Sequence, residues 1–323
     1  MSDGVHLLIP HAWAADPGCA QASRTLALPR LEKLLARLAP LSTDPGNEFT
    51  LSMPHERVLA RACGLPSEQD GLIPWAAWQM AQSGRETHGK AWARITPCHW
   101  RVGANHIDMS PPQALQLDAA SSQALLAAMQ PFFEQDGIAL EYDAPTLWLA
   151  EGEQFRNLAT ASLDRVVGRA IDQWMPHSPE GRALRRLQQE MQMLLYTHEL
   201  NEERTRAGLL PVNSFWASGT GALPTAHPAA PPQGLQVVQD LRDAALLADW
   251  DGWAAAWQRL DAQECAQLVQ ALDSGEAVTL TLCGERNARS WSQPAGRGVL
   301  RRMGGRLGGL FGGRKALSVL EAL

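Results

Sequence analysis

The densest group of side chains able to do chemistry lies between residues 196 and 221. Its imidazole, amides and guanidinium suit anions, and a guanidinium can grip a carboxylate or phosphate through two parallel hydrogen bonds. Two glycines near its end would let the backbone approach a ligand closely. The segment therefore predicts an anion-binding corner with these ligand-binding residues: His198, Asn201, Arg204, Asn213, Trp216, Gly219 and Gly221.

The same segment also has a structural interpretation. A helix is expected to end near Gly208, because glycine readily adopts the left-handed conformation that closes helices, and Pro211 prevents its continuation. The apolar run at residues 212–217 is typical of a buried strand. The polar side chains would then satisfy buried backbone groups at a helix-to-strand junction. The Gly-Thr-Gly sequence at residues 219–221 is not a P-loop, since no Gly-Lys-Ser or Gly-Lys-Thr follows it.

A second polar group lies at residues 96–106, where Cys98, His99 and His106 are of metal-ligating types. Adjacent side chains of a strand point to opposite faces, so Cys98 and His99 would not converge on one ion. We expect His99 and Trp100 either to line the wall of a ligand pocket or to have structural roles. No metal site is predicted.

Common catalytic motifs are missing from the sequence. It contains neither a Gly-x-Ser-x-Gly elbow nor a His-Glu-x-x-His motif. Asp164 and Asp172 are expected on one helix over residues 158–174, where Arg165 and Arg169 can neutralise both in surface salt bridges. No catalytic residue is assigned, and no cofactor is predicted.

Composition narrows the class of protein. The 323 residues are 45% hydrophobic and 19% charged, which is a globular composition. The net charge of −6 gives no global electrostatic reason for nucleic-acid binding. Twelve Trp accompany only two Tyr and six Phe, and this excess indicates a core, a pocket or an interface without choosing among them.

The spacing of the cysteines and the first ten residues indicate the cellular compartment of the protein. Five cysteines stand apart without Cys-x-x-Cys spacing, which disfavours a disulfide framework and a structural zinc site. We expect reduced, buried thiols. The first ten residues lack a positively charged region, and no stretch of 18 apolar residues occurs, so neither a signal peptide nor a transmembrane segment is predicted. The expected localisation is cytoplasmic.

The elements that would position these residues are partly readable. Residues 5–10 predict a strand, and residues 28–41 an amphipathic helix. Asp118 is a good N-cap for a helix over residues 119–134. The expected elements after it are a hairpin over 138–150, helices over 158–174, 179–200, 235–248 and 252–274, and a strand over 277–282. This order predicts an α/β fold, with α+β as the alternative, in which helices pack on a mixed, largely antiparallel sheet.

The expected domain organisation has four parts. Residues 1–221 form an α/β body, and the proline-rich residues 222–234 form a linker. Residues 235–285 form a helical C-terminal segment with one strand. Residues 286–323 form a glycine-rich tail with eight basic residues and one acidic residue. This tail either docks on the acidic body or stays disordered, or it makes a weak contact with an anionic lipid or nucleic-acid surface.

Several segments resemble known families. The segment from His198 to Gly221 resembles the end of the insertion domain of archaeal-type, cofactor-independent phosphoglycerate mutases. Four segments together look like bacterial RpfE-type regulatory proteins: Thr96-Pro-Cys-His-Trp-Arg-Val-Gly, Phe133-Glu-Gln-Asp-Gly, Leu163-Asp-Arg-Val-Val-Gly-Arg and Asn213-Ser-Phe-Trp. This second resemblance would cover most of the chain.

The resemblance to the mutases implies an accessory domain without their catalytic centre. That centre has a serine nucleophile beside two divalent metals, but the sequence contains no Asp-Asn-Ser or Gly-Asp-His segment. His6, His11, His55 and His88 are not accompanied by the spaced aspartates that would complete a two-metal site.

Two functions follow as hypotheses. The first is a cytoplasmic, non-catalytic regulatory or interaction protein with an unknown protein partner and a vestigial phosphate-binding corner. The alternative is a phosphoglycerate-mutase-like enzyme that acts on phosphorylated small molecules and holds the phosphate with His198, Arg204 and Asn213.

Overall fold

The computed structural model describes residues 4–87, 89–224, 230–294 and 315–323. They form two compact units that interleave along the chain. Unit 1 comprises Met1–Phe49, Pro54–Leu59 and Pro231–Leu323, and unit 2 comprises Thr50–Met53 and Ala60–Ala230. The last of these boundaries lies within the proline-rich stretch at residues 222–234.

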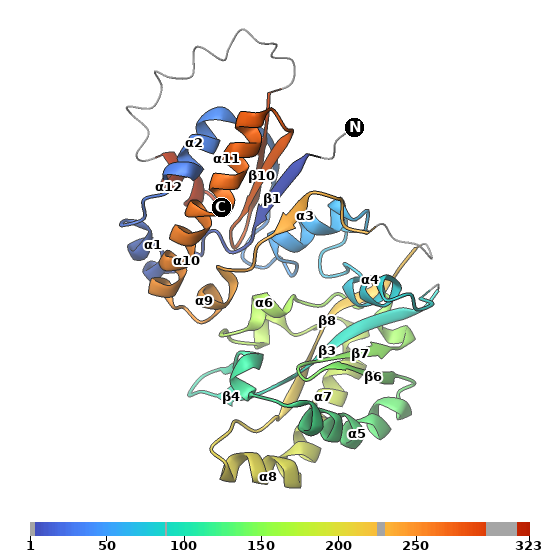
Figure 1. Cartoon of the computed structure of the whole chain (residues 1–323). Helices are drawn as coiled ribbons and strands as arrows, with labels where there is room; N and C mark the ends of the chain where they lie inside the picture. The colour runs from blue at the N-terminus through green and yellow to red at the C-terminus, as the bar shows by residue number, and fades with distance from the viewer. Residues whose placement is uncertain (1–3, 88, 225–229, 295–314) are drawn as a thin grey trace. The chain divides into compact units, whose positions relative to one another are not determined.

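Unit 1 is built on a five-stranded mixed sheet with the strand order β2-β11-β10-β1-β9. Figure 1 labels two of its neighbouring strands, β10 and β1. The strands are β1 (Val5–Ile9), β2 (Ala39–Asp44), β9 (Leu235–Val237), β10 (Val278–Cys283) and β11 (Ala288–Ser292). β1 pairs in parallel with β10 and β9, whereas β11 runs antiparallel to both β10 and β2. Every strand of this sheet except β11 therefore ends at the same edge.

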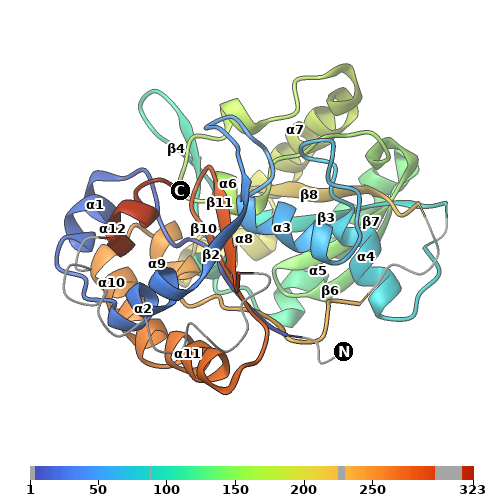
Figure 2. The same ribbon diagram turned by 90° about the horizontal axis from the view of Figure 1, so that it is seen from above.

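Helices cover one face of this sheet. They are α1 (Pro17–Ser23), α2 (Pro29–Arg37), α9 (Arg242–Leu246), α10 (Trp250–Ala262), α11 (Glu264–Ser274) and α12 (Lys315–Leu320). Leu31, Leu34 and Leu35 of α2 pack in the core beneath Leu7 and Leu280 of the sheet. This stripe follows the 3.6-residue period of an amphipathic helix. Figure 1 shows α2, α10 and α11 gathered beside β1 and β10, and Figure 2 shows the same three helices on one side of β10.

Unit 2 contains a four-stranded antiparallel sheet with the order β6-β7-β3-β8. Its strands are β3 (Ala91–Cys98), β6 (Ala139–Ala144), β7 (Leu147–Glu151) and β8 (Ser214–Ala222), and a separate hairpin joins β4 (Trp100–Val102) to β5 (Ile107–Met109). The helices are α4 (Trp75–Gln82), α5 (Ala119–Gln135), α6 (Leu163–Val166), α7 (Arg182–Tyr196) and α8 (Glu199–Arg206). A further helix, α3 (Pro54–Ala62), begins in unit 1 and ends in unit 2.

The two faces of the unit 2 sheet carry different helices. Phe133 of α5 and Met191 of α7 share a core with Ile95 of β3. The next residue toward the start of β3, Arg94, points the other way and donates to Gln79 of α4 at 3.0 Å. This alternation is the two-residue period of a strand.

The predicted fold class is confirmed: the protein is α/β, with a mixed sheet and an antiparallel sheet packed by helices. The strand at residues 5–10, the hairpin over 138–150 and the helix over 119–134 are also confirmed. Asp118 caps that helix by accepting a hydrogen bond from the Ser121 amide at 2.7 Å. Within the described residues, no helix combines the length and apolarity needed to cross a membrane.

Three element predictions are wrong in part. The helix expected over residues 28–41 ends at Arg37 and is followed by strand β2. The expected helix over 158–174 is replaced by the short α6 and a single 3₁₀ turn at Asp172–Trp174, so Asp164 and Asp172 do not share a helix. The segment at 235–248 begins with strand β9. In each case strand pairing or packing with distant parts of the chain outweighs the helix propensity of the segment.

The expected basic tail is described only at its two ends. Residues 295–314 lie outside the described residues. Residues 288–292 form strand β11 of the unit 1 sheet, and Ala316, Leu320 and Leu323 lie in the unit 1 core. These two parts are therefore structural parts of unit 1.

Candidate metal-binding site at the carboxyl edge of the unit 1 sheet

The predicted anion-binding corner lies on α8 and the strand that follows it in unit 2. His198 is the N-cap of α8 and accepts a hydrogen bond from the Leu200 amide at 3.2 Å. Asn201 is buried, donates to the carbonyls of Leu195 and Val212 at 2.8 and 2.6 Å, and accepts from the Val212 amide at 2.9 Å. The Asn201 amide therefore closes the junction between α7, α8 and the approach to β8.

Arg204 is also engaged with the backbone. Its Nε donates to the Leu210 carbonyl at 3.0 Å, and one terminal nitrogen donates to the Leu115 carbonyl. Burial lowers the pKa of this guanidinium, and the carboxylate of Asp118 opposes that shift. The group remains a cation, because an arginine in a protein does not lose its proton near neutral pH.

The other predicted ligand residues of unit 2 bond to backbone as well. Asn213 accepts from the Trp100 amide at 2.7 Å and donates to the Trp100 carbonyl at 2.9 Å. A ring nitrogen of His99 is bonded to the Pro211 carbonyl at 2.9 Å, and Trp216 donates to the Ala161 carbonyl at 3.0 Å. In all these contacts a side chain bonds to backbone groups, as the structural interpretation of this segment expects. A role of these residues in ligand binding stays a prediction.

The two glycines of this segment allow α4 to approach β8. Gly219 and Gly221 have φ angles of 61° and 130°, a region that side chains disfavour. A Cβ on Gly219 would lie 2.9 Å from the Cβ of Trp75, and one on Gly221 would lie 3.2 Å from the Cβ of Pro74. Close packing of the protein on itself therefore accounts for both glycines.

A different polar cluster lies at the carboxyl edge of the unit 1 sheet. In open α/β sheets this edge is where ligands bind, because the loops that leave the strands meet there. β1 ends at Ile9 because Pro10 follows, and proline has no amide hydrogen for a neighbouring strand. His11 comes next and has a φ angle of 54°, which is rare for a residue with a side chain. The chain then returns to the sheet edge, where the Ala12 amide donates to the Cys283 carbonyl at 2.8 Å.

A second imidazole meets His11 from α3. His55 stands in the first turn of α3, directly after Pro54, which suits the start of a helix. The His11 and His55 rings are 5.3 Å apart between centroids and inclined by 47°, and both side chains are buried. Each offers a ring nitrogen, and these nitrogens lie within 4.8 Å of one another.

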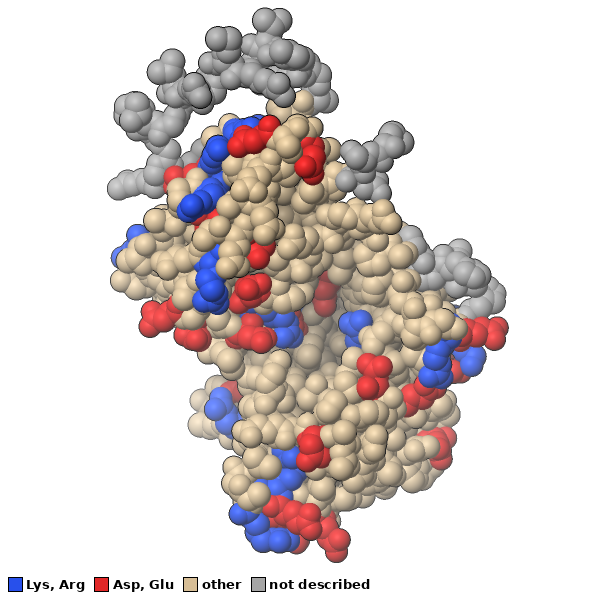
Figure 3. All heavy atoms as spheres, in the orientation of Figure 1, with Lys and Arg blue, Asp and Glu red and all other residues tan. Residues whose placement is uncertain are grey.

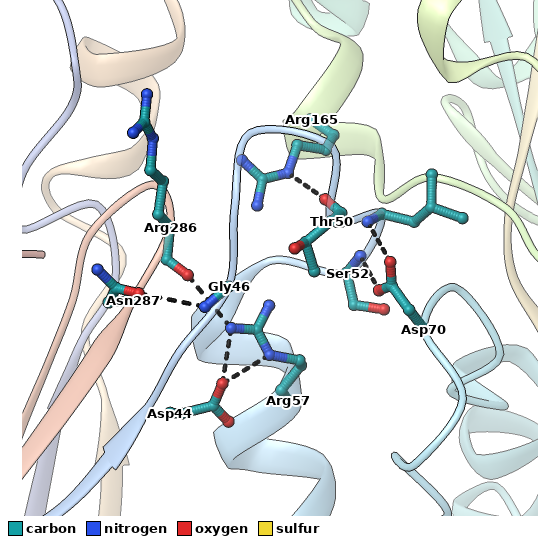
Figure 4. A network of polar contacts seen from close by, with 10 residues as sticks. Asp44, Gly46, Thr50, Ser52, Arg57, Asp70, Arg165, Arg286 and Asn287 are labelled. Carbon is teal, nitrogen blue, oxygen red and sulfur yellow. Dashed lines mark hydrogen bonds and ion pairs between the residues drawn. The ribbon is translucent and has the colours of Figure 1, made fainter.

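An ion pair between the buried Arg57 and the partly buried Asp44 fixes α3 against the same edge (Figure 4). The Arg57 guanidinium donates to the carboxylate of Asp44, the last residue of β2, with Nε at 2.8 Å and a terminal nitrogen at 2.6 Å. It also donates to the Arg286 carbonyl at 3.3 Å, while the Gly46 amide donates to Asn287 at 3.1 Å. Because Arg57 follows His55 by two residues, this pair also fixes the helical turn that carries the imidazole.

Other contacts in Figure 4 belong to unit 2. Asp70 accepts from the amides of Leu51 and Ser52 at 2.7 and 2.9 Å, and Arg165 donates from Nε to the Thr50 carbonyl at 2.8 Å. They hold the short segment Thr50–Met53 within that unit.

Surface charge gives no alternative site on the face shown in Figure 3. There, basic and acidic side chains are interspersed over the described parts of each unit. On α2, for example, Lys33 and Arg37 both pair with Asp273, at 3.5 and 2.5 Å.

The sequence pattern does not single out His11 and His55, which are 44 positions apart in the printed sequence. No spaced aspartates accompany them, and no known motif contains them. One available signal was the position of His11 directly after a predicted strand, where functional residues of α/β folds gather. The meeting of the two rings depends on where α3 packs.

Comparisons with known proteins find structural similarity only. No protein-family model matches the chain, and no curated protein matches it in sequence. The RpfE-type resemblance therefore stays a prediction. The chain is structurally similar to a cofactor-independent phosphoglycerate mutase from Thermoplasma acidophilum, with 12% identity, a TM-score of 0.37 and coverage of 91% of this chain and 90% of that one. It is also similar to the PH0037 protein from Pyrococcus horikoshii, with 11% identity, a TM-score of 0.44 and coverage of 91% and 88%.

Proposed function

We propose that unit 1 binds a divalent transition-metal ion through His11 and His55. The observation that supports this is the contact between two buried imidazoles, with ring centroids 5.3 Å apart, at the carboxyl edge of an α/β sheet. Zinc–nitrogen bonds of about 2.0–2.1 Å require the two nitrogens to lie within about 4 Å of each other. The observed limit of 4.8 Å is close enough for small side-chain rotations to bring them together.

The donor set determines which metals suit the site. Imidazole nitrogen is a good ligand for Zn²⁺, Co²⁺, Ni²⁺ and Fe²⁺, whereas Mg²⁺ and Ca²⁺ prefer oxygen. Two imidazoles leave coordination positions for water, oxygen donors or an anionic ligand. A metal with open positions can polarise a bound oxygen or lower the pKa of a bound water molecule.

Both functions expected from the sequence are compatible with such an ion. The non-catalytic regulatory protein would use it to bind an anionic ligand or to stabilise its fold. The enzyme acting on phosphorylated small molecules would use it as a Lewis acid. Interconversion of 3-phosphoglycerate and 2-phosphoglycerate by the metal-loaded protein would favour the enzyme, and ligand binding without turnover would favour the regulatory protein.

Replacement of either histidine tests the metal site. Isothermal titration of the chelator-treated protein with Zn²⁺ or Co²⁺ should show one ion per chain. His11→Ala and His55→Ala should each weaken binding by at least about tenfold, because losing a ligand costs more than the 10–100-fold lost with groups that only hold ligands in place.

The matched control is His106→Ala. His106 is a histidine of unit 2 with a half-exposed side chain, paired with Asp108 at 3.2 Å. This variant should bind the metal as the unaltered protein does. Equal binding by all three variants would refute the proposal, as would the absence of any bound ion in the unaltered protein.

A further inference from the structure

A row of tryptophans on α10 lies under the turn that carries His11. Trp250, Trp253 and Trp257 recur at helical spacing, so they share one face of the helix. Neighbouring rings meet edge to face, with centroids 6.1 and 6.3 Å apart. Trp253 and Trp257 are completely buried in the unit 1 core. Edge-to-face contacts fix the orientation of each indole and hence the direction of its N–H group.

Two of these N–H groups point at the His11 turn. Trp253 Nε1 donates to the His11 carbonyl at 2.9 Å, and Trp257 Nε1 donates to the Ala12 carbonyl at 3.3 Å. With the bond from the Ala12 amide to the Cys283 carbonyl, the turn is held by both the helix and the sheet.

The His11 backbone needs such support. A φ angle of 54° on a residue with a Cβ is strained, and strained residues persist only where their surroundings fix them. Relaxing this φ angle requires a rotation about the N–Cα bond of His11, which would carry both the imidazole and the His11 carbonyl away from their present directions. The bond to the carbonyl of His11 opposes this rotation directly.

We propose that Trp253 is a positioning residue for the metal ligand His11. Its indole N–H holds the left-handed backbone of His11, and this directs the imidazole toward His55. The inference rests on the proposed metal function, and it gives part of the tryptophan excess a role beyond filling the core. Trp257 holds the next carbonyl with a longer bond and has less influence on the ring.

Two conservative substitutions isolate the hydrogen bond. Trp253→Phe removes the N–H but retains an aromatic ring in the core, and Trp257→Phe makes the same change one helical turn later. Co²⁺ is the probe, because its visible absorption spectrum depends on ligand geometry. Affinity is measured by competition with a chelator, and a thermal melt shows that each variant is folded. Trp253→Tyr, which also lacks the indole N–H, is the second variant if Trp253→Phe folds poorly.

Trp253→Phe should bind Co²⁺ about tenfold more weakly, the lower end of the range for groups that hold metal ligands in place. Its Co²⁺ spectrum should also change. Trp257→Phe should stay within about twofold of the unaltered protein and retain its spectrum, although both variants lose core area. A purely structural role would lower both melting temperatures and leave both spectra unchanged.

The outcomes separate the two proposals. If the unaltered protein binds Co²⁺ and Trp253→Phe matches it in affinity and spectrum, the positioning role is overturned while the metal site stands. If the unaltered protein binds no Co²⁺, the metal site is overturned. The ¹⁵N ring resonances of His11, assigned with His11→Gln, then decide the positioning role. They should shift in Trp253→Phe and not in Trp257→Phe, and unchanged resonances would overturn it.

Discussion

Individual polar residues of this protein mostly serve its own backbone. Asn201 and Asn213 each bond to backbone groups on a neighbouring segment, and Arg204 spans two carbonyls. A buried carbonyl or amide that loses its partner is costly, which is why amide and guanidinium side chains suit junctions between elements. The imidazoles of His11 and His55 lie against each other.

Asn201→Ala should therefore destabilise the fold. The substitution leaves two carbonyls and one amide of unit 2 without their present partner, so the free energy of unfolding should fall by about 2–3 kcal/mol. Urea denaturation measures this change, and the exposed Asn157→Ala should alter it by less than about 0.5 kcal/mol. A variant that keeps its stability but loses stabilisation by added phosphate would contradict the structural role and favour the anion-binding corner.

At the scale of elements, the unit 1 sheet has two unlike faces. One packs against helices through Leu7, Leu280 and Trp291. On the other, a ring nitrogen of His6 is bonded to the Thr281 hydroxyl at 2.8 Å, and this hydroxyl is bonded to Ser290 at 2.8 Å. This hydroxyl chain links β1, β10 and β11. Burial lowers the pKa of His6, because desolvation disfavours the charged imidazole.

The lowered pKa of His6 predicts a stability that depends on pH. The unfolded chain takes up a proton near its ordinary pKa of about 6.5, while the folded chain resists until a lower pH. The stabilisation is present above pH about 6.5 and is lost as the pH falls through the pKa of the folded state. The melting temperature should fall between pH 7.5 and pH 5.5, and His6→Gln should reduce this fall. The control His177→Gln, at an exposed histidine, should leave this fall unchanged. If His6→Gln showed the same fall as the unaltered protein, the assignment of the pH dependence to His6 would be contradicted.

At the scale of the whole molecule, the chain passes between its two units more than once. Unit 2 is almost continuous, but unit 1 joins the start of the chain to its end. All five cysteines are buried free thiols, distributed over both units. Burial raises the pKa of Cys19 to about 11 and also raises those of Cys63, Cys98 and Cys265. The expectation of buried thiols is confirmed, and their reduced state stays a prediction.

Thiol reactivity should therefore report global unfolding. At pH 8 the native protein should react slowly with Ellman's reagent, since the thiolate is the nucleophile and buried thiols hold their protons. All five thiols should react once denaturant is added. A thiol of the native protein that reacts within seconds would contradict this picture and identify an opening near that cysteine.

The amino-acid sequence alone determined what depends on near neighbours in the chain. The Asp118 cap, the hairpin over residues 138–150 and the helix end at Gly208, whose φ angle is 75°, each depend on a few adjacent residues. The same holds for the α/β class, which follows from the order and periodicity of its elements.

Only the tertiary structure decided what depends on distant segments. Strand β11 was not expected, because residues 288–292 read as part of a basic tail until β10 and β2 pair with them. The contact of His11 with His55 depends on how α3 packs against the unit 1 sheet, and the bond from Trp253 to His11 joins residues 242 positions apart. Such contacts form only when the whole unit folds, because no local propensity encodes which distant segments meet.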